Sequence, residues 1–241
     1  MPSVDPDEVA AAVAASLEER ADASTRDWWT KYLKGEAEFR GVKMADTRKV
    51  VRAVDGQFGL GALPVDALLD VTDRLFAVDT TEDKLAAVLL LAERHLDRLR
   101  TEDVPRLARP LADDELADWN SCDWYCVKVL GPFVEVDEVE HRARAIASWS
   151  TAPGVWQRRA AAVSFVNVVG RSEPFAGFDE LMVEVAERNV ADPTRWSQTS
   201  VGWLLRELSD RAPDLVVEFV ERHGERMSTE ARRAATARLP K

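Results

Sequence analysis

The fold is decided by two stretches of sequence that begin forty residues apart, Trp156-Gln-Arg-Arg-Ala-Ala-Ala-Val-Ser-Phe-Val166 and Trp196-Ser-Gln-Thr-Ser-Val-Gly-Trp-Leu-Leu-Arg206. In both stretches apolar residues recur at the spacing of a helix face. Each stretch follows another helical pattern, over 137–149 and over 178–190. The sequence therefore predicts pairs of helices that repeat at about forty residues.

A helix pair of this period is typical of HEAT-like repeats, which stack into a solenoid with the second helices on the concave side. Helix-starting residues support the division, because Pro64 precedes a helix expected over 65–77, Thr80 one over 85–99, and Pro213 and Ser228 the last two. We predict an all-α, HEAT-like solenoid (an α-α superhelix) forming one domain over 1–241. An irregular α-bundle is the alternative.

The composition limits the classes of protein. The two cysteines and three histidines have no metal-ligand spacing, so we predict no metal and no cofactor. No segment has the pattern of a signal peptide or the apolar length of a membrane span, so we expect a cytoplasmic protein with no membrane partner.

The charge is unevenly distributed along the chain. The net charge is −11, yet residues 24–52 hold eight basic against four acidic residues and residues 226–241 hold five against one. Both ends are therefore locally basic and could contact phosphate, whereas the remainder is strongly acidic. Chance clustering on a solvated surface is the alternative.

Three segments carry residues that packing alone does not require. Trp119 and Asp123 stand four apart, which on a helix places a carboxylate beside an indole; alternatively, Asp123 is a helix N-cap. Arg158 and Arg159 lie in an apolar helix and need an anion, which is either a carboxylate of a neighbouring repeat or a phosphate. Trp203, after Gly202, is either a core residue or a ligand contact. In a solenoid these segments would converge on the concave face.

Four segments together resemble the AlkD-like DNA alkylation repair family, in family order over about residues 28–238. They are Tyr32-Leu-Lys-Gly-Glu-Ala-Glu-Phe39-Arg-Gly41-Val42 with Arg48, Trp119-Asn-Ser-Cys-Asp123, Trp156-Gln-Arg-Arg159 and Gly202-Trp203-Leu-Leu-Arg206-Glu207. The sequence departs from the family pattern at Asn120, where many relatives have Asp, and at Thr199, where Lys is common.

The resemblance implies a monofunctional DNA glycosylase that hydrolyses the N-glycosidic bond of cationic N3- or N7-alkylated purines in double-stranded DNA, as in base excision repair. It implies catalytic roles for Asp123, Trp119 and Trp203. We expect DNA contacts from a further set of basic residues: Arg159, Arg158, Lys34, Lys43, Arg48 and Arg206.

We expect a monomer that associates with the nucleoid when it is bound to DNA. Two other functions fit the same scaffold. One is a HEAT-repeat protein that binds DNA without catalysis, which the presence of Asp123 opposes. The other is a protein-interaction solenoid, which the net charge of −11 favours and the four matching segments oppose.

Overall fold

The computed structural model describes residues 4–170 and 173–239, and all the regular elements within these ranges are helical. The prediction of an all-α fold is therefore confirmed. Contacts within the chain define two compact units, residues 1–124 (unit 1) and 125–241 (unit 2), and each is described by itself. The single domain expected over 1–241 stays a prediction.

Unit 1 is built from seven labelled α-helices and four short turns of other helix types. The α-helices are α1 (Pro6–Glu18), α2 (Ala23–Tyr32), α3 (Met44–Phe58), α4 (Val65–Phe76), α5 (Thr81–Leu90), α6 (Val104–Ala112) and α7 (Trp119–Tyr125), the last residue of which lies past the unit boundary. The short turns are η1 (Leu60–Ala62), η2 (Leu91–His95), η3 (Leu96–Arg98) and η4 (Thr101–Asp103).

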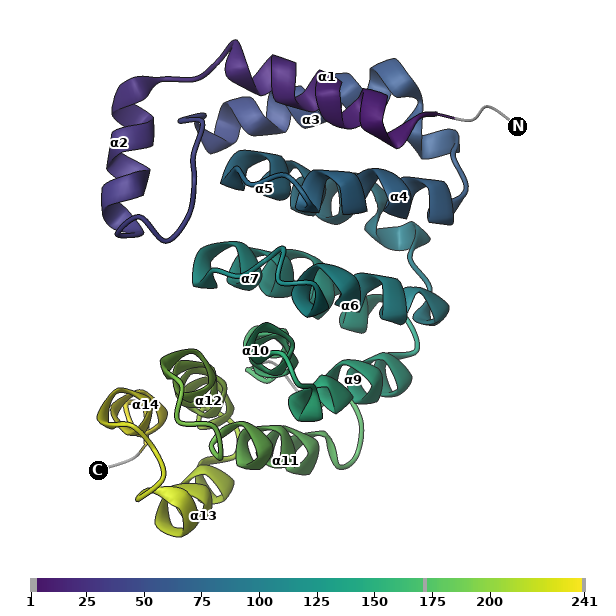
Figure 1. Ribbon diagram of the computed structural model, residues 1–241. Coiled ribbons are helices and arrows are strands. Elements are labelled where there is room, and N and C mark those ends of the chain that lie inside the picture. The colour runs from purple at the N-terminus through teal and green to yellow at the C-terminus, as the bar shows by residue number, and fades with distance from the viewer. Residues whose placement is uncertain (1–3, 171–172, 240–241) are drawn as a thin grey trace. The chain divides into compact units, whose positions relative to one another are not determined.

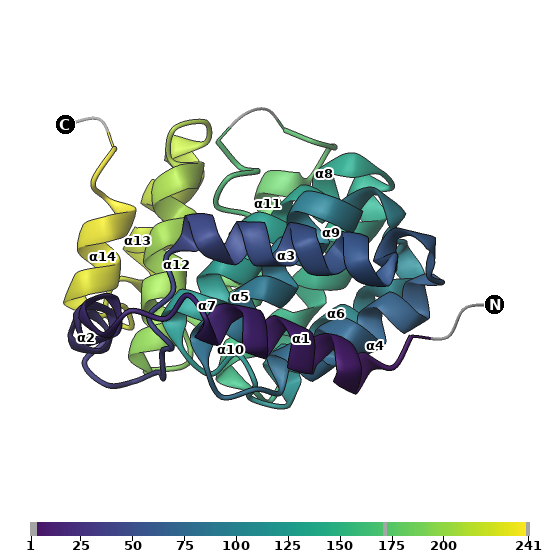
Figure 2. The same cartoon turned by 90° about the horizontal axis from the view of Figure 1, so that it is seen from above.

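The core of unit 1 lies between layered helices. Helix α1 packs on α3 and α4, and α5 packs on the same two helices. Figure 1 shows α1 and α3 in one layer and α4 and α5 in the next. Val9, Leu17, Leu68 and Val88 are fully buried there, and each such side chain contributes about 1.5–3 kcal/mol through the hydrophobic effect. Helix α2 is the exception, because it runs crosswise to α1 and α3 and appears end-on in Figure 2.

Unit 2 contains the helices whose forty-residue period the sequence predicts, which are α9 (Val139–Ala147), α10 (Val155–Val163), α11 (Phe178–Asn189) and α12 (Arg195–Leu208). Its other helical elements are η5 (Cys126–Leu130), α8 (Gly131–Val136), η6 (Ser148–Thr151), α13 (Pro213–His223) and α14 (Thr229–Ala235).

The helices of unit 2 pack in two layers. Helices α10, α12 and α14 pack in succession in one layer, and α9, α11 and α13 do so in the other. The rings of Trp156 and Trp196, which begin the two quoted stretches, lie 5.7 Å apart with an interplanar angle of 31°. Equivalent positions of two repeats are therefore in contact, as the period predicts.

The helix expected over 85–99 is shorter and less regular in the structure. Helix α5 ends at Leu90, and the chain continues as the π-helical turn η2 and the 3₁₀ turn η3. In the irregular part, Arg98 of η3 donates hydrogen bonds to the carbonyl oxygens of Leu60 and Leu63, which a straight helix over 85–99 was not expected to do. Among the helices that the structure describes, none is both long and apolar enough to cross a bilayer.

Candidate functional site

Trp119 and Asp123 both lie on α7, one helical turn apart. The helix is capped by Asp118, whose Oδ1 accepts a hydrogen bond from the backbone N–H of Ser121 at 2.9 Å. The alternative in which Asp123 is the N-cap is therefore wrong, because Asp123 lies inside the helix. The side chains of Trp119 and Asp123 are both part-exposed, whereas Asn120 between them is buried.

The ring of Trp119 is joined to a group of aromatic residues on α2, which the sequence reasoning did not place beside it. The ring centroids of Tyr32 and Trp119 lie 6.0 Å apart. Tyr32 in turn stacks on Trp28, with centroids 5.1 Å apart and ring planes 7° from parallel. The only sequence signal for this group is the i, i+4 spacing of Trp28 and Tyr32, which predicts their contact with each other but not with α7.

The segment Phe39 to Val42 holds the loop between α2 and α3 in place. The carboxylate of Glu82, which is buried on α5, accepts hydrogen bonds from the backbone N–H groups of Arg40, Gly41 and Val42 at 2.8–2.9 Å. Gly41 has φ +94°, and a Cβ there would lie 2.3 Å from the carbonyl oxygen of Asp22. This part of the N-terminal motif therefore has a structural role in unit 1.

The basic residues expected to contact DNA in unit 1 differ in their surroundings. Lys34 and Lys43 are exposed, and within the described residues neither forms an ion pair. Lys34, two residues after the end of α2, has the left-handed conformation, with φ 54°. Arg48 instead pairs with Glu93, with Nε and Oε1 2.7 Å apart. Lys34 and Lys43 are thus the more available cations of the three.

Arg158 and Arg159, adjacent on α10 of unit 2, have different partners. Arg158 donates to the carbonyl oxygens of Ala152 and Pro153 and pairs with Asp192, with Nη2 and Oδ2 2.5 Å apart. Partial burial raises the pKa of Asp192, but hydrogen bonds from Thr194 and Arg158 outweigh this effect and lower it to about 2. The sequence allowed either a carboxylate or a phosphate as the partner of Arg158, and the structure contains the carboxylate, that of Asp192.

Arg159 is buried between α10 and α12, with 4% of its surface exposed. Its Nη1 donates to the carbonyl oxygen of Trp196 at 2.8 Å and to Oγ1 of Thr199 at 3.0 Å. Thr199 is one of the two positions at which the sequence departs from the family pattern. Its hydroxyl now has a clear role, because it helps to fix the guanidinium of Arg159 against α12.

Trp203 and Arg206 lie on α12, one residue and four residues after Gly202. Trp203 is part-exposed, so it is not a core residue. A Cβ at Gly202 would lie 2.7 Å from the carbonyl oxygen of Ala231, which shows that this glycine allows α14 to approach. Arg206 pairs with its neighbour Glu207, with Nη2 and Oε1 2.7 Å apart.

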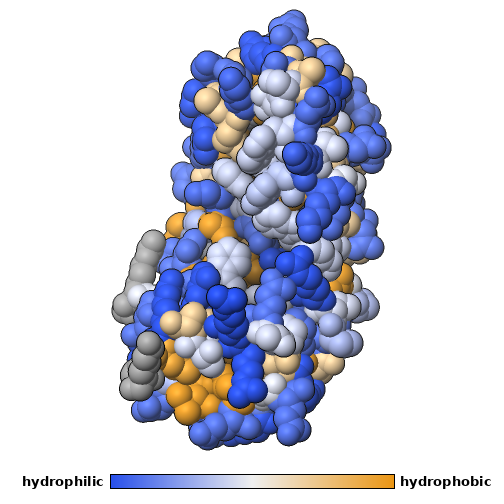
Figure 3. All heavy atoms as spheres, turned by 90° about the vertical axis from the view of Figure 1, so that its left-hand side faces the viewer, coloured by the Kyte–Doolittle hydropathy of each residue, from blue (hydrophilic) through white to orange (hydrophobic). Residues whose placement is uncertain are grey.

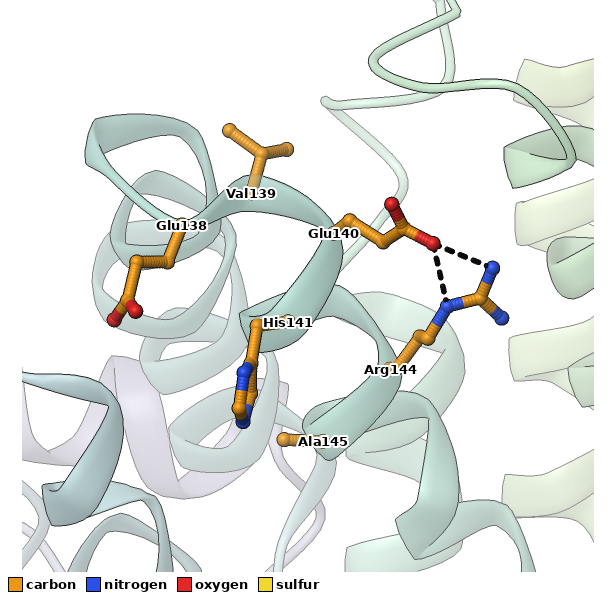
Figure 4. Close-up of a pocket in the computed structure, with 6 residues that line it drawn as sticks. All are labelled: Glu138, Val139, Glu140, His141, Arg144 and Ala145. Carbon is orange, nitrogen blue, oxygen red and sulfur yellow. Dashed lines mark hydrogen bonds and ion pairs between the residues drawn. The ribbon is translucent and has the colours of Figure 1, made fainter.

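A large open hollow of about 870 Å³ lies at the start of α9, in unit 2. The described residues that line it are Glu138, Val139, Glu140, His141, Arg144 and Ala145. Figure 4 shows the Glu140–Arg144 ion pair on the side of this helix away from Glu138. None of the predicted site residues is in this set. Within residues 4–170 and 173–239, no group of three or more His, Cys, Asp or Glu has the arrangement of a metal site.

The comparisons with known proteins agree with the fold and with the family that the sequence resembles. A solved structure described as a predicted DNA alkylation repair enzyme from Enterococcus faecalis superimposes with a TM-score of 0.76 at 19% identity, covering 92% of this chain and 98% of that one. No curated protein sequence matches the chain. The family model described as DNA alkylation repair enzyme matches residues 13–239. The chain therefore belongs to the DNA alkylation repair enzyme family.

Proposed function

We propose that the protein is a monofunctional DNA glycosylase, which hydrolyses the N-glycosidic bond of cationic N3- or N7-alkylated purines in double-stranded DNA. The observation that carries the proposal is the placement of Asp123 one helical turn from Trp119 on the capped helix α7, where both residues are part-exposed. Membership of an alkylation repair family supplies the class of damage.

The chemistry needs little beyond a well-placed carboxylate. Alkylation at N3 or N7 makes the purine cationic, so the base leaves with the electron pair of the C1′–N bond and becomes neutral. Positive charge then develops on the deoxyribose, and a carboxylate beside the sugar stabilises that charge. The oxygen of a water molecule forms the new bond to C1′, and its proton passes to Asp123 or to solvent.

The aromatic residues have a supporting role in this proposal. Trp119, on the same helix as Asp123, would present its electron-rich face to the sugar as positive charge develops there. We retain Trp203, on α12 of unit 2, as a catalytic residue in the proposal with the same kind of role. Such contacts contribute on the order of 0.5–2 kcal/mol each, depending on how completely water is excluded.

The basic residues would hold the phosphates of the duplex. Lys34 and Lys43 are exposed and take part in no ion pair within the described residues, so they carry this role most directly. We retain Arg48, Arg206, Arg158 and Arg159 as DNA contacts in the proposal. Three of these arginines are paired with carboxylates in the free protein, and on binding DNA they would have to exchange or share those partners: Arg48, Arg206 and Arg158.

The Asp123→Asn variant tests the catalytic role. Because Asn keeps the shape and loses the charge, single-turnover release of 7-methylguanine from a duplex should fall by at least about 100-fold. Affinity for a duplex with a tetrahydrofuran abasic analogue should stay within about threefold of wild type.

Asp97→Asn is the matched control, because Asp97 is an exposed carboxylate of the same unit outside the site. It should release the base at the wild-type rate. Release at that rate by the Asp123→Asn variant would remove Asp123 from the mechanism.

A further inference from the structure

None of the ten residues of helix α2 is buried, and its aromatic side chains are presented to solvent. Trp28 and Tyr32 are 57% and 53% exposed, and they stack on each other in parallel. In Figure 3 the part of the surface that α2 occupies has a pale area of intermediate hydropathy, the class to which Trp and Tyr belong. An indole and a phenol held together in water form a surface with the shape and chemistry of a stacking platform.

Both ends of α2 are held by contacts outside the helix. At its start, the backbone N–H of the N-cap Asp22 donates to the carbonyl oxygen of Gly41 at 3.0 Å, and hydrogen bonds from Ser24 and Thr25 to the Asp22 side chain lower its pKa to about 2. At its end, Leu33 is buried, and Trp29 stacks on the buried ring of Phe39 with centroids 5.5 Å apart. The following loop is held by Glu82. A helix with no buried residue of its own is thus preorganised by its flanks.

The charge around the platform favours an anionic partner. Lys31 lies on the same helical face as Trp28 and Tyr32. Arg26 precedes these two aromatic residues in the sequence and Lys34 follows them. All three are exposed, and none forms an ion pair within the part of the chain that the structure describes. Aromatic faces next to unpaired cations are the combination that binds unstacked nucleotides, with cations on the phosphates and rings on the bases.

We propose that α2 is a second DNA-contacting surface, on which a nucleobase that has left the base stack packs against Trp28 and Tyr32. The inference rests on the proposed function, and it deepens it by naming the partner of α2. Tyr32 also contacts Trp119, so the platform continues to the helix that carries Asp123 within the same unit. A base displaced beside the lesion would therefore have a place to stack next to the catalytic residues.

The test compares two duplexes of one sequence, one fully paired and one with a single unpaired 2-aminopurine at its centre. Wild-type protein should bind the bulged duplex more tightly and quench the 2-aminopurine fluorescence. Trp28→Leu, which keeps apolar bulk without a ring, should lower affinity for the bulged duplex by about tenfold, because one base–aromatic stack is lost. It should leave affinity for the paired duplex within about twofold.

Trp28→Phe is the matched control, because it restores a ring and should recover most of the affinity and the quenching. Equal losses on both duplexes, or no loss on either, would overturn the inference. So would a wild-type dimer that Trp28→Leu dissociates in sedimentation, since α2 would then bind a second copy. The two duplexes contain no alkylated base, so this binding test does not depend on catalysis. A protein that prefers the bulged duplex but does not release 7-methylguanine would contradict the proposed catalysis and leave this inference intact.

Discussion

Arg158 and Arg159 show how two identical neighbours on one helix acquire different tasks. Arg158 is held by Asp192 and two backbone carbonyl oxygens, so it fastens α10 to the loop before α12. Arg159 is more deeply buried and donates to α12 itself. A buried guanidinium has little surface for a phosphate. The test of its contribution to DNA binding therefore needs a measurement that distinguishes a lost phosphate contact from a distorted fold.

The salt dependence of DNA binding supplies that measurement. If Arg159 contacts a phosphate, Arg159→Gln should reduce the slope of log K against log salt by about 0.9, the value for one neutralised phosphate. Lys43→Gln, at an exposed cation, should give the same reduction and serves as the reference. A variant Arg159→Gln that binds more weakly at every salt concentration with an unchanged slope would assign the residue to the scaffold.

The residues of α7 show what sequence spacing can predict at this scale. The four-residue separation of Trp119 and Asp123 correctly predicted one helical turn, because that relation depends on local geometry alone. The contact of Glu82 with the backbone of residues 40–42 could not be predicted from local spacing, since the two segments lie about forty positions apart in the sequence. No local pattern marks a carboxylate that binds three distant N–H groups.

At the scale of elements, α12 and α14 pack unusually closely. A Cβ at Gly202 would lie 2.7 Å from the carbonyl oxygen of Ala231 and 2.8 Å from its Cα. Neither neighbour is a flexible side chain, so the two helix backbones would have to separate. Because Trp203 and Arg206 lie on α12, that separation would also shift candidate DNA contacts.

Gly202→Ala should therefore destabilise the protein by about 1–3 kcal/mol, the usual cost of overpacking. Urea denaturation measures the change in the free energy of unfolding. Gly56→Ala is the matched control, because Gly56 is exposed on α3 and a Cβ there meets nothing within 4 Å. Since Ala is the better helix former, that control should be neutral or stabilising by up to about 1 kcal/mol. A neutral Gly202→Ala would contradict the close packing.

The helices of unit 2 were largely predictable, and those of unit 1 less so. Helices α9 to α14 begin within a few residues of their expected starts, because apolar periodicity and caps are local signals. The π-helical turns η2 and η5 were not expected, since one inserted residue leaves the apolar pattern nearly unchanged. The crosswise course of α2 depends on Glu82 and Phe39, which are tertiary contacts.

At the scale of the whole molecule, the acidic net charge is compatible with an anionic ligand because many cations are free of ion pairs. Of the eight basic residues in 24–52, ion pairs within the described residues hold Arg40, Arg48 and Lys49. The five that form none there are Arg26, Lys31, Lys34, Lys43 and Arg52. Local availability, not the sum of −11, therefore decides whether this part of the surface attracts phosphate.

The central claim concerns which bond breaks, and product analysis in ¹⁸O-labelled water tests it most directly. The account predicts free 7-methylguanine, an abasic sugar that carries one ¹⁸O at C1′, and a strand that stays intact until alkali is added. Loss of the methyl group from a base that remains attached to DNA, with no ¹⁸O in the sugar, would contradict hydrolysis of the glycosidic bond.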